Sequence, residues 1–220
     1  DDVALVRGAA LTFIDVVKAA RAKVFYPVTR SGRFMEVKAY LDDSQAAEAK
    51  PATDAAARAI LACEGLDDLL DILTVCATRI LAIAGGAGTE SEIRAVLRGE
   101  EFSGDPVAEL RTSTEAALGK RPWTPALAAA AAFRDTYDAL IQRASFGGRE
   151  TLGGDDFHAF TRTMERVAFG PPVASAVFLL DLIDSGRIRT DLMARGEEDL
   201  SVLAREVGAT VLIDAVLPPP

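Results

Sequence analysis

The chain has 220 residues, half of them hydrophobic, which is enough for one sizeable domain or two small ones. Its net charge of -9 argues against nucleic acid as a partner, because phosphate binding needs clustered Lys and Arg. The longest apolar stretch, Leu66 to Ala84, is interrupted by four charged side chains, so it predicts a buried helix. We therefore expect no contact with nucleic acid or with a membrane.

The few cysteines and histidines argue against a metal site. A zinc site needs about four N or S ligands, and the chain offers only Cys63, Cys76 and His158, with no CxxC pair. The two cysteines are expected to act as small hydrophobic residues in a reducing cytoplasm. No metal is predicted, and the expected location is cytoplasmic.

The N-terminal region predicts a strand, a turn and a helix. Residues Val3 to Val6 are aliphatic and β-branched, Gly8 follows, and apolar residues recur at helical spacing from Leu11 to Ala22. Residues 24–40 alternate and contain a turn-like "TRSGR", which predicts a β-hairpin.

The middle of the chain, Pro51 to Ser185, is alanine-rich and helical. Its start signals are a capping box at "TESE", Asp105 before Pro106, Thr124 before Pro125, Asp155 or Asp156, and "GPP" at residues 170–172. These signals predict helices over 54–63, 66–84, 90–97, 106–118, 125–146, 155–168 and from "GPP" to Gly186.

The C-terminal region returns to strand-like patterns. "RIRTDL" predicts a short strand, "EDLSVLAREVG" fits a helix or a strand, and "ATVLIDAVLPPP" holds the clearest strand in the chain. The predicted fold is mostly α with a few strands, a helical insert between the strand-bearing ends of one α/β domain. The expected division is 1–50, 51–185 and 186–220, and both ends are expected to be internal to a longer protein.

Three stretches resemble one family. "LVRGAALTFIDVV" resembles the strand, glycine turn and helix of the actinobacterial-type FAD/NAD(P)-binding proteins, which are flavoproteins. "PVAELRTSTEAALGKRPWTPALAAAAAFRDTYDALIQRASFGG" resembles their helical region, and "AFGPPVASAVFLLDLIDSGRIR" with "VLIDAVLPPP" resembles a later passage. The resemblance is good for 106–189 and both ends and poor for 21–104, and its motifs are specific only in combination.

The resemblance implies a Rossmann-like flavoprotein domain that binds FAD, with NAD(P)H as the expected second cofactor. In the family the FAD fingerprint is a glycine-rich turn nearer the N-terminus, and no GxGxxG occurs in this chain. The chain would then be an internal segment whose partners are the rest of the parent polypeptide and a small-molecule substrate.

The turn that follows the first strand is the candidate cofactor site, with Gly8, Ala9, Ala10 and Thr12. A strand that leads into a helix aims the helix's first amides at one point, where anions bind. Ala10 stands where the family pattern has its second glycine, and its methyl group would hold a phosphate away. Thr12 would either cap the helix or bond a phosphate oxygen. The sequence leaves open whether Gly8 only makes a turn or faces a cofactor.

Other candidates have simpler structural explanations. Gly170, Pro171 and Pro172 are substrate-side candidates, although a helix start is the favoured explanation for them. Arg134 and Asp138 are spaced for a surface ion pair, and Asp214 is a weak candidate for a ribose or substrate contact.

Two functions are therefore carried forward. The first is a segment of an FAD-dependent, NAD(P)H-linked oxidoreductase that contributes a degenerate nucleotide-binding turn and a helical substrate-side covering, inactive by itself. The alternative is an acidic, helical binding or scaffolding module without catalytic activity.

Overall fold

The computed structural model describes residues 2–100 and 104–216. Helices hold 59% of the residues and three strands form one small parallel sheet, which confirms the mostly-α class with a few strands. The chain divides into two compact units. The sheet unit comprises Asp1–Met35, Ser103–Thr114 and Gly170–Pro220, and the helical unit comprises Glu36–Phe102 and Glu115–Phe169. The predicted boundaries near residues 50 and 185 stay predictions.

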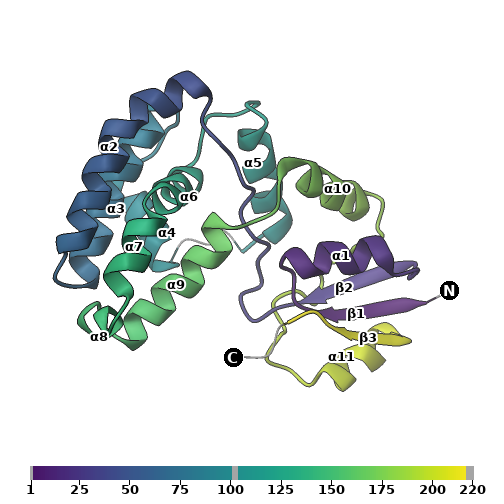
Figure 1. The fold of residues 1–220 in the computed structure, drawn as a ribbon. Coiled ribbons are helices and arrows are strands. Elements are labelled where there is room, and N and C mark those ends of the chain that lie inside the picture. The colour runs from purple at the N-terminus through teal and green to yellow at the C-terminus, as the bar shows by residue number, and fades with distance from the viewer. Residues whose placement is uncertain (1, 101–103, 217–220) are drawn as a thin grey trace. The chain divides into compact units, whose positions relative to one another are not determined.

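The sheet unit is built around three parallel strands in the order β2-β1-β3. Leu5 of the central strand pairs with Tyr26 of β2 and with Leu212 of β3. Figure 1 shows α1 on one face of this sheet and α11 on the other. The elements in chain order are β1 (Val3–Arg7), α1 (Leu11–Ala19), β2 (Val24–Val28), α10 (Val173–Asp184), α11 (Leu200–Val207) and β3 (Val211–Asp214).

Hydrophobic spacing explains how this unit packs. Phe13, Ile14 and Val17 recur at helical spacing and are the buried residues of α1. Alternate side chains of a strand point to opposite faces, and Leu5 and Tyr26 share one buried cluster with Leu203 of α11. Both faces of the central strand are therefore covered.

The predicted hairpin over 24–40 is wrong. Its first half forms β2, which pairs in parallel with β1, and the rest holds only an isolated bridge residue, Lys38. The other edge of β2 is also used, because the Phe25 N–H donates to Arg187 O and the Arg189 N–H donates to Phe25 O. A hairpin partner would have no edge of β2 to bond.

The C-terminal predictions have mixed outcomes. The clearest predicted strand forms β3, although its last residues, 217–220, lie outside the described part of the chain. "EDLSVLAREVG" contains the helix α11. The strand expected at "RIRTDL" is reduced to an isolated bridge between Ile188 and Phe25.

The helical unit is organised around one enclosed helix. Every residue of α6 from Ala126 to Phe133 is buried, and α6 packs against α3, α4 and α9. Small alanine side chains let neighbouring helices approach α6 closely. The helices are α2 (Asp43–Ala62), α3 (Leu66–Ile83), α4 (Glu90–Arg98), α6 (Pro125–Asp135), α7 (Tyr137–Ala144), α8 (Gly148–Thr151) and α9 (Asp155–Ala168), while α5 (Pro106–Ala117) has residues in both units.

Three predicted helix starts are confirmed with their side-chain caps, whereas α9 begins at Asp155 as expected but has Gly154 as its N-cap residue and no side-chain cap. Thr89 and Glu92 form a reciprocal capping box at the start of α4. The Asp105 carboxylate accepts from the amides of Val107 and Ala108, and the Thr124 hydroxyl accepts from the amide of Leu127. These signals involve only nearby residues, which is why the sequence alone reveals them.

Two helices differ from the prediction. Helix α2 begins at Asp43, earlier than expected, because Asp42 and Gln45 form a capping box and Pro51 is accommodated inside the helix. The long helix expected over 125–146 is split into α6 and α7 at Thr136, whose buried hydroxyl donates to Ala132 O at 2.8 Å.

Among the described residues, no helix is both long enough and apolar enough to cross a membrane.

Candidate functional site

The Gly8 turn lies at the carboxyl edge of the sheet, beside its central strand. Gly8 follows β1 directly, has a φ of +111°, and donates its N–H to Val28 O at 2.8 Å. Because β1 has β2 on one side and β3 on the other, the strand order reverses at this edge. In open α/β sheets ligands bind at such a switch point, outside the carboxyl ends of the strands.

The chain that follows β3 lies against the turn. A Cβ atom on Gly8 would come within 3.3 Å of both Ala215 O and the Cγ2 of Val216. The Ala215 N–H donates to Arg7 O at 2.9 Å, which fixes this approach. Gly8 is therefore required for its positive φ and for the close approach of this segment.

The N-terminus of α1 has no side-chain cap. Ala10 is the N-cap residue and makes no capping hydrogen bond, and the first turn holds no acidic residue. The expected cap by Thr12 does not form, because Thr12 lies inside the helix and is exposed. No carboxylate in the first turn of α1 therefore neutralises the positive end of the helix dipole, which favours the binding of an anion at this end.

Two of the predicted stretches meet around a small hollow within the sheet unit. Ala9 and Ala10 of the turn and Pro171 of "GPP" line it together with apolar side chains. The hollow is too constricted to admit a water molecule. Its lining residues are Ala9, Ala10, Ile14, Phe34, Met35, Leu110, Pro171 and Leu179. The structure brings the two stretches together by packing, and leaves no ligand-sized space between them.

The remaining residues of "GPP" serve the start of α10. Gly170 is buried, and Pro172 is the exposed N-cap residue of the helix, which begins at Val173. Both prolines therefore precede the first helical residue, Val173. Their fixed φ still orients the chain entering the helix.

Polar groups that the sequence analysis missed follow β2 at the same edge. The Thr29 hydroxyl accepts from the Gly32 N–H at 2.9 Å and lies 3.5 Å from the Ser31 hydroxyl. Arg30 is largely exposed, with Glu197 at 3.9 Å. Thr29, Arg30 and Ser31 come about 20 positions after Gly8. Dinucleotide-binding domains contact the ribose at this distance from their glycine turn, so the spacing is a signal in the sequence that could have identified these residues.

Asp214 is exposed rather than buried. Its carboxylate lies 3.6 Å from Arg7 and accepts from the Val216 N–H at 3.0 Å. These contacts hold the segment that covers Gly8, so the role of Asp214 is structural. A half-exposed ion pair of this kind stabilises a protein little.

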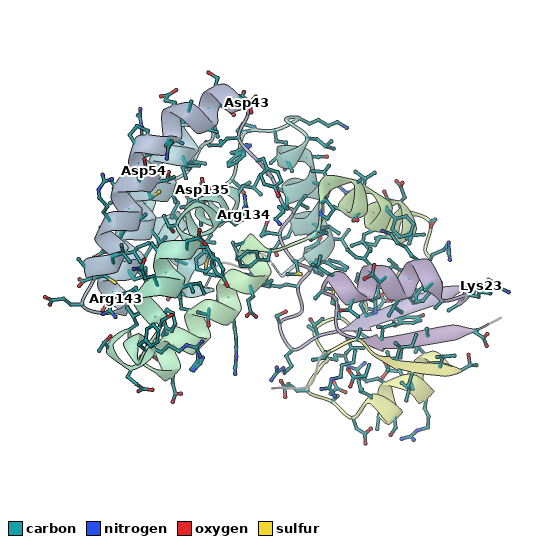
Figure 2. The ribbon with its side chains drawn as sticks, in the orientation of Figure 1. Lys23, Asp43, Asp54, Arg134, Asp135 and Arg143 are labelled. Carbon is teal, nitrogen blue, oxygen red and sulfur yellow. The ribbon has the colours of Figure 1, made fainter. Side chains whose placement is uncertain are left out.

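The predicted Arg134–Asp138 surface pair is wrong. Arg134 is partly buried in the helical unit (Figure 2). Its guanidinium donates to Ala168 O at 3.1 Å and to Ala39 O at 2.6 Å. It also lies 5.5 Å from the ring centroid of Tyr40. Partial burial raises the pKa of the neighbouring Asp135, although Arg134 opposes this rise. Arg134 thus satisfies the last carbonyl of α9.

Neither cysteine is placed for nucleophilic chemistry. Cys63 and Cys76 are buried and unpaired. Burial raises the pKa of Cys76 to about 12, with a contribution from Asp135, and burial also raises the pKa of Cys63. His158 is exposed on α9. Within the described residues, no three His, Cys, Asp or Glu side chains gather in a way that could hold a metal ion.

No protein-family model matches this chain, and no curated protein matches it in sequence.

Proposed function

We propose that the sheet unit is the incomplete part of a Rossmann-like domain in an FAD-dependent, NAD(P)H-linked oxidoreductase. The observation that carries the proposal is the parallel β1–α1–β2 unit with an uncapped helix N-terminus at the edge where the strand order reverses. The resemblance of "LVRGAALTFIDVV" to the FAD/NAD(P)-binding proteins supports the same assignment. The helical unit's role as a substrate-side covering stays a prediction.

The residues of the turn fit a cofactor only in part. Gly8 and the first amides of α1 suit a negatively charged group, whereas the Ala10 methyl and the nearby Val216 restrict how closely a pyrophosphate could approach. Gly8, Ala9, Ala10 and Thr12 would therefore face an anionic part of the cofactor without enclosing it. Thr29 and Ser31 supply hydroxyl groups at the same edge.

The bound flavin and nicotinamide would supply the hydride-transfer chemistry. The residues of this chain would orient the cofactor and place positive dipole near its negative charge. The FAD fingerprint itself would belong to the parent polypeptide outside this chain.

The first test is the flavin content of the intact parent protein. We expect it to purify yellow, with an absorption band that is released as free FAD on denaturation. A parent protein that is colourless and takes up no added FAD would refute the proposal. The 220-residue chain, titrated into FAD, is expected to quench its fluorescence only weakly, and micromolar binding would show that the site is more complete than proposed.

A matched pair of substitutions tests the turn directly. Ala10→Asp and Ala10→Asn both supply an N-cap oxygen and should stabilise α1 alike, but only Asp adds negative charge. We expect Ala10→Asp in the parent protein to weaken FAD binding or raise the nicotinamide KM by about tenfold, and Ala10→Asn to have little effect. Equal effects of the two variants would show that no anionic group faces the turn.

One observation favours the alternative, a helical binding module without catalysis. The Gly8 turn is covered by Ala215 and Val216, and the adjoining hollow admits no water. The alternative predicts a flavin-free parent protein whose stability is unchanged by FAD and NADPH, so the flavin measurement separates the two functions.

The proposal places the protein in the cytoplasm. Two buried cysteines without a disulfide suit a reducing compartment. Mass spectrometry of the alkylated native protein would detect any disulfide that contradicts this.

A further inference from the structure

The turn that joins α7 to α8 holds an aromatic residue in an unfavourable backbone conformation. Among the described residues, Phe146 is the only residue other than glycine with a positive φ, at +54°. Gly147 follows with a φ of +89°, and the Gly148 N–H donates to Ser145 O at 3.0 Å. Two central residues with positive φ and this hydrogen bond are the pattern of a type I′ turn, which favours Asn, Asp or Gly at both positions. The backbone therefore disfavours phenylalanine here.

The Phe146 side chain obtains no burial that would offset this cost. Its ring is fully exposed to solvent. The turn is nevertheless held in place, because an added Cβ at Gly148 would overlap with Arg143 O. The structure therefore maintains a conformation that presents a phenyl ring to solvent. A residue that the backbone disfavours, and that adds nothing to the core, indicates a role in binding.

A recess lies directly beside the exposed ring. Its volume is about 470 Å³, which is larger than a phenyl ring, and Phe146 itself forms part of its wall. Ile141 and Ala144 of α7 give it an apolar lining, and Ile141 is 50% exposed. Tyr137, one turn earlier on α7, is also partly exposed. The same surface of the helical unit therefore carries both a protruding aromatic side chain and a recess suited to receive one.

Opposite charges border this recess. Arg149 and Glu150 are adjacent on α8, and both are exposed and line the recess. In the part of the chain that the structure describes, neither side chain has a hydrogen-bond or ion-pair partner. A two-fold axis through this surface would allow Arg149 of one copy to face Glu150 of the other, because such an axis places the same patch on both sides. The surface is therefore complementary to itself in shape and in charge.

We propose that the Phe146 ring inserts into the recess of a second copy of this chain and that the second copy's ring is received in return. The result is a two-fold symmetric dimer of helical units. Tyr137, Ile141 and Phe146 supply less apolar surface than the about 800 Å² per partner of a stable interface, so the dimer is weak. We expect a Kd of about 10–100 μM. This proposal goes beyond the proposed function and does not depend on the flavin content.

The dependence of mass on concentration tests the proposal first. In sedimentation equilibrium, the 220-residue chain should have its monomer mass of 23.3 kDa at the lowest concentrations. The mass should rise towards twice this value as the concentration increases from about 1 μM to about 500 μM. A chain that stays monomeric over this range would overturn the proposal.

Phe146→Asn separates association from folding. Asparagine suits a type I′ turn, so the variant should be at least as stable as the unmodified chain in thermal unfolding. Its Kd should rise by about tenfold or more, because the inserted ring is lost. Val75→Gln removes an exposed apolar side chain from α3 and is the matched control, which should leave the Kd unchanged. An unchanged Kd in Phe146→Asn would place the association on another face and overturn the proposal.

Charge reversals test the pairing between the two copies. Arg149→Glu and Glu150→Arg each put like charges opposite one another across the axis, so each variant alone should dimerise more weakly than the unmodified chain. An equal mixture of the two variants should associate about tenfold more tightly than either alone, because opposite charges then meet across the interface. A mixture that associates no more tightly than its components would overturn the two-fold arrangement.

Discussion

The two units enclose their central elements in different ways. In the helical unit, α6 is surrounded by helices of the same unit, and its residues from Ala126 to Phe133 are buried. In the sheet unit, β1 is equally enclosed, whereas β3 beside it is largely exposed. A helix satisfies its own backbone and needs only neighbours for its side chains. A parallel strand needs a layer on each face and a bonded strand at each edge, so a sheet shows incompleteness that a helical bundle does not.

The largest expected effect tests the enclosed core of the helical unit. Leu69→Ala removes a fully buried side chain from α3 and should destabilise the protein by about 2–5 kcal/mol. Val75→Ala, at a 67% exposed position on the same helix, should cost less than about 0.5 kcal/mol. Urea unfolding followed by circular dichroism measures both. Similar losses for the two variants would contradict the enclosed core.

The next effect tests the turn in the sheet unit. Gly8→Ala forces a side chain into the left-handed region and against Ala215, and it should cost about 1–3 kcal/mol. Gly65→Ala is the control, because an added Cβ there meets no atom and the backbone is extended. Thermal unfolding compares the variants, and a Gly8→Ala protein as stable as the control would show that the turn is not constrained.

A polar contact in the helical unit should have a smaller effect. Arg143 donates from Nε and Nη2 to Cys63 O, at the end of α2, and from Nη1 to Thr151 Oγ1 (Figure 2). Lysine cannot reproduce this planar set of donors, so Arg143→Lys should cost about 1–2 kcal/mol. Arg149→Lys, on exposed α8, is the matched control. Chemical unfolding that fails to distinguish the two variants would rule out this role of Arg143.

The smallest effect concerns the exposed cap of α4. Hydrogen bonds from the Thr89 amide and hydroxyl lower the pKa of Glu92 below its ordinary value of 4.5. Because the folded pKa is lowered, the stabilisation is fully present above pH 4.5 and is lost as the pH falls through the folded value. Glu92→Gln should flatten this part of the stability profile, and Glu90→Gln in the same turn should not. Thermal unfolding between pH 3 and about pH 6 detects the difference.

Helix boundaries set by adjacent residues could be predicted, and those set by distant contacts could not. The sequence predicts the start of α3 at Leu66, and the caps at Thr89, Asp105 and Thr124, because each signal lies within four residues. The break at Thr136 carries no Gly or Pro, and the buried bond from its hydroxyl to Ala132 O does not mark a break, because Thr74 makes the same kind of bond inside the unbroken α3. The residues of the capping box at Asp42 are visible in the sequence, but the hairpin predicted directly before them led us to place the start of the helix later.

The candidate site shows the same division. The strand, Gly8 and helix of the turn could be predicted from local pattern, and the positive φ of Gly8 agrees with it. The approach of Val216 and the hollow shared with Pro171 join segments more than 150 residues apart, so no local pattern contains them. The partners of Arg134 are backbone carbonyls. Every residue has such a carbonyl, so the sequence does not show which residues Arg134 contacts.

The pairing of β1 with β3 has a consequence for synthesis. Val3 and Thr210 are bonded across 207 positions in the chain, so closing this contact requires a very long loop. At about 5–20 residues per second, the ribosome would deliver β3 some 10–40 s after β1. During that interval the central strand has β2 as its only partner, and its other edge is available for aggregation. We expect pulse-labelling exchange during refolding to protect the helical unit first and the β1–β3 amides last, because the β1–β3 pairing closes the longest loop.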